Sequence, residues 1–187
     1  MRFLPTSLTG VTIIEPDVFR DGRGFFLETY RADKYGQGGI EPRFVQDNHS
    51  RSVRDTIRGL HAQRKHPQAK LVRALAGTIV DVVVDIRRGS RTYLQWISLE
   101  LSADNFRQLY VPAGYAHGLC VVSEFAEIEY KCTDYYDPED ELRIIWNDPS
   151  IGIRWPIAAP LLSPKDGSAL TIEKQMDLLP KVNEASA

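Results

Sequence analysis

Apolar residues occur along most of the chain in short runs or in alternation with polar residues, and turn residues separate the runs. This pattern is typical of short β-strands, whereas the periodicity of an amphipathic helix is nearly absent. We expect strands at residues 71–75, 78–86, 93–101, 107–111, 118–122 and 125–135, with a hairpin-like break at Ala76-Gly77. Short helices are expected at residues 32–35 and after Ser163-Pro164, where serine can cap and proline can begin a helical turn.

Many short strands at this spacing predict an all-β fold, a sandwich or closed barrel of the jelly-roll type, because this architecture protects sheet edges. A length of 187 residues suits a single domain spanning residues 1–187. Its core is expected at about 11–170, followed by a loose polar tail after about residue 180.

The composition is that of an ordinary globular protein, with 43% hydrophobic residues, 26% charged residues and a formal net charge of −2. There is no strongly basic region and no apolar run near the roughly 20 residues that a membrane-spanning helix needs. We therefore expect neither nucleic acid nor membrane as a partner, and a cytoplasmic location. Cys120 and Cys132 lie in apolar, strand-like segments and are predicted to be buried thiols rather than a disulfide.

Polar side chains are predicted to enter the interior of the barrel, because residues two apart on a strand share a face. The inward set of the strand at 125–135 is Ala126, Ile128, Tyr130 and Cys132, and the outward set is Glu127, Glu129 and Lys131. By the same rule His61 and Gln63 share a face, and Lys70 lies where the following strand starts. An interior that holds His, Gln, Lys and Tyr is too polar to serve only as a packed hydrophobic core.

Three roles are open for His61: a metal ligand, a general base, or a structural histidine held by a hydrogen bond. A metal needs three or four ligands that converge on one point. The sequence offers His61 and His117, but Gln63 stands where a second histidine would be expected, Gln68 is a weak ligand, and Lys70 is a competing positive charge. We therefore expect no metal and no cofactor.

A metal-free polar cavity suits proton transfer instead, since the reference pKa of histidine near 6.5 lets it accept a proton close to neutral pH. Asp166 can orient one ring nitrogen of His61, although an aspartate at a helix start is also favoured by the dipole alone. Tyr130 can return a proton from the opposite wall, and Lys70 can stabilise an oxygen that gains negative charge. Such parts suit an epimerase that works through an enolate. Taken singly, Tyr130 is better explained as a core tyrosine and Lys70 as an exposed strand-end charge.

A series of short blocks in a fixed order narrows these choices. The blocks are Asp21-Gly22-Arg23-Gly24-Phe25-Phe26-Leu27-Glu28 and residues 45–50, 58–63, 70–72, 81–87, 112–118, 130–131, 146–149 and 163–166. Together they resemble the dTDP-4-dehydrorhamnose 3,5-epimerase family, a cupin-type jelly roll, from Val11 to about Leu170. Each block is weak alone, but so many in order are specific.

The resemblance implies a role for each matching residue. His61 would be the base paired with Asp166, Tyr130 the acid, and Lys70 the stabiliser of the enolate oxygen. The implied substrate-binding residues are Arg23, Phe26, Glu28, Gln46, Asn48, Arg58, His117, Tyr136, Glu141 and Lys165. Arginine binds phosphate in a bidentate manner, so Arg58 and Arg23 are expected on the diphosphate. Phe26 and Tyr136 are expected to stack on the thymine.

The resemblance also implies a homodimer in which the amino-terminal segment crosses to the neighbouring subunit. Arg23, Phe26 and Glu28 would then complete the neighbour's site. The implied substrate is a dTDP-4-keto-6-deoxyhexose, and the implied reaction inverts carbons 3 and 5 of dTDP-4-dehydro-6-deoxy-D-glucose to give dTDP-4-dehydro-L-rhamnose.

Some positions depart from the family pattern and keep more than one function open. The loop at residues 62–69 is one residue shorter than usual, Ala62 replaces an aromatic residue, and Leu94 and Leu142 stand where glycine is common. These changes can reshape the pocket, and relatives include enzymes that invert only carbon 3 or carbon 5. A metal-dependent cupin enzyme and a non-catalytic nucleotide-sugar binding module are two further functions that the sequence leaves open.

Overall fold

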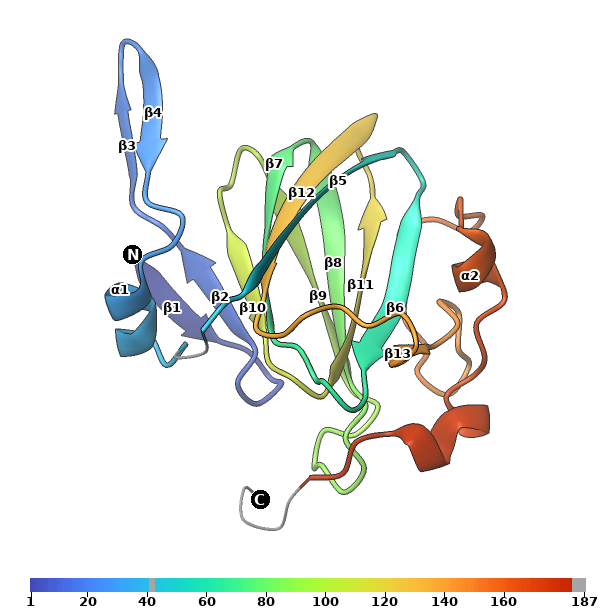
Figure 1. Cartoon of the computed structure of the whole chain (residues 1–187). Helices are drawn as coiled ribbons and strands as arrows, with labels where there is room; N and C mark the ends of the chain where they lie inside the picture. Colours follow the sequence, from blue (N-terminus) through green and yellow to red (C-terminus); the bar gives the residue numbers. More distant parts are fainter. Residues whose placement is uncertain (41–42, 183–187) are drawn as a thin grey trace.

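The computed structural model describes residues 1–40 and 43–182, and β-strands dominate it (Figure 1). The strands are β1 (Arg2–Pro5), β2 (Thr12–Glu15), β3 (Val18–Asp21), β4 (Gly24–Leu27), β5 (Gln46–Val53), β6 (Ile57–Gln63), β7 (Lys70–Ala76), β8 (Thr78–Asp85), β9 (Trp96–Ser102), β10 (Gln108–Val111), β11 (Tyr115–Val121), β12 (Phe125–Cys132) and β13 (Glu141–Arg143). The helices are α1 (Ala32–Gln37), α2 (Pro164–Gly167) and the 3-10 helix Glu173–Leu178.

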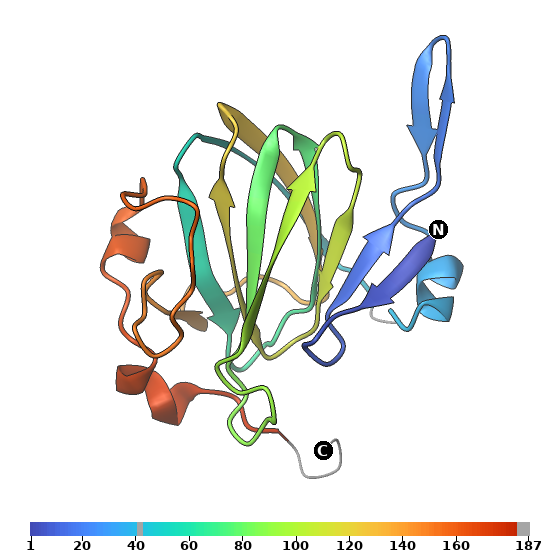
Figure 2. The same cartoon turned by 180° about the vertical axis from the view of Figure 1, so that it is seen from behind.

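Two antiparallel sheets face each other and enclose the interior (Figures 1 and 2). One sheet has the strand order β1-β2-β10-β7-β12-β5, and the other has the order β13-β6-β11-β8-β9. A separate hairpin, β3 with β4, projects away from both sheets near the amino terminus (Figure 1). The expected all-β fold of the jelly-roll type is confirmed.

The main core lies between the two sheets and follows the period of two that strands impose. Val72, Leu109 and Ile128 enter it from the six-stranded sheet, and Ile79 and Val83 enter it from the five-stranded sheet. On β12 the predicted alternation is confirmed, with Ala126, Ile128 and Cys132 buried and Tyr130 packed against the core.

A second core covers the outer face of the five-stranded sheet. Val82 and Val84 of β8 and Ala116 of β11 pack there against Ile151 and Ile172 of the carboxyl-terminal part of the chain. Burial on both faces explains why most residues of β8 and β11 are buried and apolar instead of alternating with polar residues.

The predicted hairpin at Ala76-Gly77 is wrong, because β7 and β8 lie in different sheets. The chain crosses between the sheets at Gly77, which has a φ of +69°. A Cβ atom at this position would lie 2.0 Å from the carbonyl oxygen of Phe125, so only glycine fits the crossing.

Other strand boundaries differ for local reasons. The strand expected at 93–101 begins at Trp96, because residues 91–94 form a turn in which Leu94 has a φ of 62°. The strand expected at 125–135 ends at Cys132, and the one expected at 118–122 begins at Tyr115. The four strands before residue 28 were not predicted, since each has only four residues.

The two predicted short helices are confirmed, and α1 extends to Gln37. In α2 the backbone N–H of Asp166 donates to Ser163 Oγ at 3.1 Å, which is the expected serine cap. Both cysteines are buried free thiols, as predicted.

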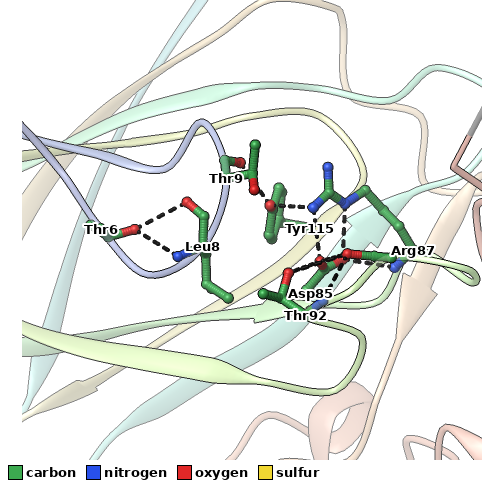
Figure 3. Close-up of polar contacts among 8 residues, drawn as sticks. Thr6, Leu8, Thr9, Asp85, Arg87, Thr92 and Tyr115 are labelled. Carbon is green, nitrogen blue, oxygen red and sulfur yellow. Dashed lines mark hydrogen bonds and ion pairs between the residues drawn. The ribbon is translucent and has the colours of Figure 1, made fainter. Parts of the chain in front are cut away.

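A polar network joins the end of β8 to the start of β11 and to the turn after β1 (Figure 3). Asp85 accepts hydrogen bonds from Arg87, Ser90 and Thr92, with distances of 2.8, 2.5 and 2.6 Å to Oδ2. Tyr115 accepts from Arg87 and donates to the Thr9 carbonyl oxygen at 2.8 Å. The network therefore connects the amino-terminal turn to the barrel.

The loose tail expected after about residue 180 falls mostly on residues 183–187, which lie outside the described residues. Before that point the chain is paired, since Arg88 N donates to Pro180 O at 2.7 Å and Val182 N donates to Arg88 O at 3.0 Å. Within residues 1–40 and 43–182, no helix has the length and apolar character needed to cross a membrane.

Candidate active site

A cavity of about 270 Å³ opens at the end of the barrel where β6 and β12 end and β5 and β7 begin. The side chains around it come from both sheets and from the loops beside them. They are Gln46, Asn48, His61, Ala62, Gln63, Gln68, Lys70, Tyr130, Cys132, Tyr136 and Glu141. The cavity thus brings together seven of the residues predicted from the sequence: Gln46, Asn48, His61, Lys70, Tyr130, Tyr136 and Glu141.

His61 is held from behind by Asp166. His61 Nε2 donates to Asp166 Oδ1 at 2.6 Å, and Ser163 Oγ donates to Asp166 Oδ2 at 2.9 Å. Burial by itself would raise the pKa of Asp166, but its hydrogen bonds to His61 and Ser163 outweigh burial and leave the pKa lowered. Asp166 is therefore an anionic partner that fixes the imidazole, and Nδ1 is the ring nitrogen left for chemistry.

A second carboxylate lies on the other side of the imidazole. Glu141 Oε1 is 4.0 Å from His61 Nδ1 and is only slightly exposed. The imidazole therefore lies between two carboxylates, with Asp166 at Nε2 and Glu141 near Nδ1.

Lys70 and Tyr130 line the same cavity, and Lys70 Nζ lies 5.9 Å from the centre of the Tyr130 ring. Burial lowers the pKa of Lys70, and negative groups including Asp81 and Glu141 oppose that effect. Burial also raises the pKa of Tyr130, against the nearby charge of Arg58. Tyr130 therefore keeps its phenolic proton at neutral pH and can donate it.

Gln46, Asn48 and Cys132 form a short chain of hydrogen bonds on one wall. Gln46 Nε2 donates to Asn48 Oδ1 at 2.9 Å, and Asn48 Nδ2 contacts Cys132 Sγ at 3.6 Å. The sequence placed Cys132 on the same face as Tyr130, and that parity was the signal for its position at the cavity.

His117 is buried beside the site instead of lining the cavity. It is the cross-strand partner of His61, on β11 against β6, and its Nε2 donates to Asp81 Oδ1 at 2.8 Å. Asp81 is fully buried, and within the described residues its Oδ2 has no hydrogen-bond partner. Asp81 was not predicted as a site residue, although an aspartate within the apolar run of β8 was a visible signal.

The pairing of these two histidine-bearing strands depends on small residues. A Cβ atom at Gly59 would lie 2.7 Å from the His117 carbonyl oxygen and 2.8 Å from Gly118 Cα. The register also shifts between His117 and Leu119. Glycine is therefore required at position 59, where the backbone of β11 leaves no room for a side chain.

Arg58 and Lys165 lie outside the cavity lining. Arg58 is exposed on β6 and its Nε donates to Ser52 Oγ at 2.9 Å. Lys165 lines an adjoining cavity of about 190 Å³ together with Glu141, Arg143 and Gln175. Glu141 is common to both cavities, so the two are neighbours.

The three predicted residues of the amino-terminal segment also lie apart from the cavity. Arg23 and Phe26 lie on the β3–β4 hairpin, which projects from the barrel (Figure 1). Both side chains are exposed, and Arg23 pairs with Asp21. Glu28 pairs with Lys34 at 2.7 Å and with Arg31 at 3.7 Å. Within this chain, then, the hairpin does not contribute to the cavity around His61.

Across residues 1–40 and 43–182, no three His, Cys, Asp or Glu side chains are grouped so that they could hold a metal ion. Gln63, at the position where a further histidine ligand would be expected, is hydrogen-bonded to the backbone of Asp137.

The chain is similar to known proteins over most of its length. Residues 5–174 match the family model described as dTDP-4-dehydrorhamnose 3,5-epimerase. A protein of that name from Pseudomonas aeruginosa is 51% identical over 168 residues, which cover 89% of this chain and 93% of the relative. A Neisseria gonorrhoeae protein of the same name is 52% identical over 167 residues, but this chain spans only about half of it, 51% of its length.

A solved structure gives the same result in three dimensions. The dTDP-6-deoxy-D-glucose-3,5-epimerase of Legionella pneumophila, in complex with dTDP-4-keto-L-rhamnose, superposes with a TM-score of 0.94. It is 46% identical in sequence, and the match covers 97% of this chain and 98% of the other.

Proposed function

The chain belongs to the dTDP-4-dehydrorhamnose 3,5-epimerase family, and from this membership we propose that it is an isomerase acting on a dTDP-linked 4-keto-6-deoxyhexose. It inverts carbons 3 and 5 of dTDP-4-dehydro-6-deoxy-D-glucose and gives dTDP-4-dehydro-L-rhamnose. The observation that carries the proposal is the His61–Asp166 pair, which shares one cavity with Tyr130 and Lys70.

In the first half of the reaction His61 acts as the base. Its Nδ1 removes the proton from a carbon next to the ketone, and the electron pair moves onto the carbonyl oxygen to give an enolate. Asp166 stabilises the imidazolium that forms, and the Lys70 ammonium stabilises the enolate oxygen. The ketone acidifies the C–H bond by itself, so the proposal requires no cofactor and no metal.

In the second half Tyr130 acts as the acid. Its phenol donates a proton to the opposite face of the same carbon, and the carbonyl group re-forms with the configuration inverted. Carbons 3 and 5 both flank the ketone at carbon 4, so one oxygen-stabilising lysine serves both inversions. Exchange with solvent returns His61 and Tyr130 to their starting protonation states.

The remaining predicted residues are proposed to bind the substrate. Gln46, Asn48 and His117 contribute polar groups around the sugar, and Arg58 binds the diphosphate in a bidentate manner. Tyr136 stacks on the thymine, with Glu141 and Lys165 beside the nucleotide. The adjoining cavity that holds Lys165 supports this extension of the site.

The protein is further proposed to be a homodimer in which the β3–β4 hairpin reaches the neighbour's site. There Arg23, Phe26 and Glu28 complete the substrate contacts. Support comes from the projection of the hairpin away from the barrel (Figure 2). The side chains of Phe19 and Phe26 on it are 64% and 70% exposed. Exposed aromatic side chains of this size are typical of a surface that another molecule covers.

The buried free thiols are consistent with a proposed cytoplasmic location.

Solvent exchange tests the reaction directly. The dTDP-linked keto sugar is incubated with the enzyme in deuterated buffer, and carbons 3 and 5 are followed by NMR. Deuterium with inversion at both carbons is expected. Inversion at one carbon alone would assign a mono-epimerase, binding without exchange would assign a non-catalytic module, and turnover that depends on stoichiometric iron, nickel or manganese would assign a metal-dependent enzyme.

A further inference from the structure

Three glutamine side chains around the cavity bind the backbone of one segment, residues 134–137, which carries Tyr136. Gln68 Nε2 donates to Asp134 O at 2.7 Å, and Gln46 Oε1 accepts from Tyr136 N at 3.0 Å. Gln63 makes two bonds to one residue: its Nε2 donates to Asp137 O at 2.9 Å and its Oε1 accepts from Asp137 N at 3.0 Å.

This segment depends on the glutamines because it has little regular backbone pairing. Strand β12 ends at Cys132, and Thr133 N donates to Ala69 O at 3.1 Å as the last ladder-like contact. The next backbone bond within the described residues is the local turn from Asp140 N to Asp137 O at 3.2 Å. Between these two points, amide side chains take the place of a neighbouring strand.

Gln63 is suited to this task by its chemistry. A primary amide carries a donor and an acceptor side by side, so it can pair with the N–H and C=O of one backbone residue. A neutral histidine carries its donor and its acceptor on different edges of the ring, and an ionised glutamate offers acceptors alone, so neither can pair with both groups of one backbone residue. The absence of a second histidine two residues after His61 therefore has a positive explanation, since that position needs an amide.

The geometry points to Gln63 as a positioning residue, and we propose that it acts with Gln46 and Gln68 as a clamp. The clamp holds residues 134–137 so that the Tyr136 ring stands as a fixed wall of the cavity. Tyr136 is 46% exposed and lies in the connection between β12 and β13, outside any strand. Holding that backbone before binding reduces the entropy lost when the ring packs on a ligand. The part of the inference that concerns substrate rests on the proposed function, in which Tyr136 stacks on the thymine.

Hydrogen exchange in the protein alone tests the clamp without any substrate. In Gln63→Ala the amide of Asp137 is expected to exchange about tenfold faster, because its hydrogen bond to Gln63 Oε1 is lost. Gln63→Glu, which keeps the shape but places a carboxylate against the Asp137 carbonyl oxygen, is expected to do the same. Gln95→Ala is the matched control, since Gln95 is exposed and remote from the segment. Unchanged exchange in both Gln63 variants, with folding intact by thermal melting, would overturn the proposal.

A double-mutant cycle tests whether the effect on binding passes through Tyr136. Gln63→Ala is expected to weaken dTDP binding about tenfold by calorimetry, and to raise KM more than it lowers kcat. In a Tyr136→Ala background the same change is expected to have an effect of about twofold or less. Equal effects in both backgrounds would show that Gln63 acts independently of Tyr136 and would overturn the positioning role. If the wild-type protein introduces no deuterium into the sugar, the proposed function fails. Amide hydrogen exchange in the protein alone still tests the clamp in that case.

Discussion

His61 Nε2 lies 2.6 Å from Asp166 Oδ1, although the two residues are 105 positions apart in the chain. Asp166 reaches this position because α2, capped by Ser163, packs beside β6. The capping serine also donates to the second oxygen of Asp166, so one residue both starts the helix and fixes the carboxylate.

Replacing Asp166 by asparagine is expected to lower kcat about 10²-fold or more, because the ring loses its orientation and the imidazolium loses its counter-charge. Steady-state kinetics on the keto sugar measure the effect. Asp177→Asn, which changes a fully exposed carboxylate, serves as the control. A kcat of Asp166→Asn equal to that of the wild type would exclude Asp166 as the partner of the base.

Tyr130→Phe is expected to exchange the sugar proton with solvent without inverting the configuration of the carbon. His61 still removes the proton and can return deuterium to the same face, but no acid remains on the opposite side. NMR in deuterated buffer should then show label in the sugar with the original configuration. Tyr110→Phe, a change of a buried tyrosine away from the cavity, should invert normally. Inversion by the Tyr130 variant at the wild-type rate would assign the acid to another group.

The alkaline limb of the pH profile is expected to report Lys70. Burial lowers the pKa of this lysine, and only its charged form stabilises an enolate, so kcat should fall as pH rises through a value below the ordinary 10.5. Burial shifts the pKa of Tyr130 upward, in the direction opposite to that of Lys70, so a lysine variant separates the two groups. Lys70→Arg keeps its charge and should lose the limb while retaining measurable turnover. A fall in kcat at high pH that persists in this variant would assign the alkaline limb to a group other than Lys70.

Asp85 is expected to stabilise the fold through the network of Figure 3. Burial alone would raise the pKa of Asp85, but its bonds to Arg87, Ser90 and Thr92 outweigh burial and lower it. Because the pKa of Asp85 is lower in the folded protein than in the unfolded chain, its ionisation stabilises the fold. This contribution is fully present at pH values above 3.8, the pKa in the unfolded chain, and is lost as the pH falls through the lower pKa of the folded protein. Asp85→Asn should therefore lower the free energy of unfolding by about 3 kcal/mol at neutral pH and by less near pH 3. Urea denaturation at both pH values, with exposed Asp104→Asn as the control, measures the difference. An equal loss at the two pH values would contradict the ionic explanation.

Subunit mixing is expected to test the shared site. The chain mass is 21.2 kDa, so light scattering should give about twice this value for the wild type. His61→Ala and Arg23→Ala homodimers should each have low activity. If the hairpin acts across the dimer, the mixed dimer regains one complete site, formed by His61 of one subunit and Arg23 of the other. A mixture that gains no activity over the separate variants would place Arg23 in the site of its own subunit.

Much of the framework is readable from local pattern. Alternation on β12 placed Ala126, Ile128 and Cys132 inward, and the serine-proline pair placed the start of α2. These features depend on strand parity and on capping chemistry, both of which act within a few residues. The apolar runs of β8 and β11 likewise indicated buried strands, although the runs alone could not say which sheet holds them.

Only the tertiary structure decided which distant residues meet. Crossing of the chain at Gly77 separates β7 from β8, and the packing of α2 brings Asp166 to His61. The pairing of His117 with Asp81 and of Gln63 with the Asp137 backbone likewise joins strands and loops that are remote in sequence. Sequence by itself determined the kind of element and the chemical groups available. Tertiary structure determined their partners, because a hydrogen bond across a barrel is set by the path of the whole chain and not by the residues beside it.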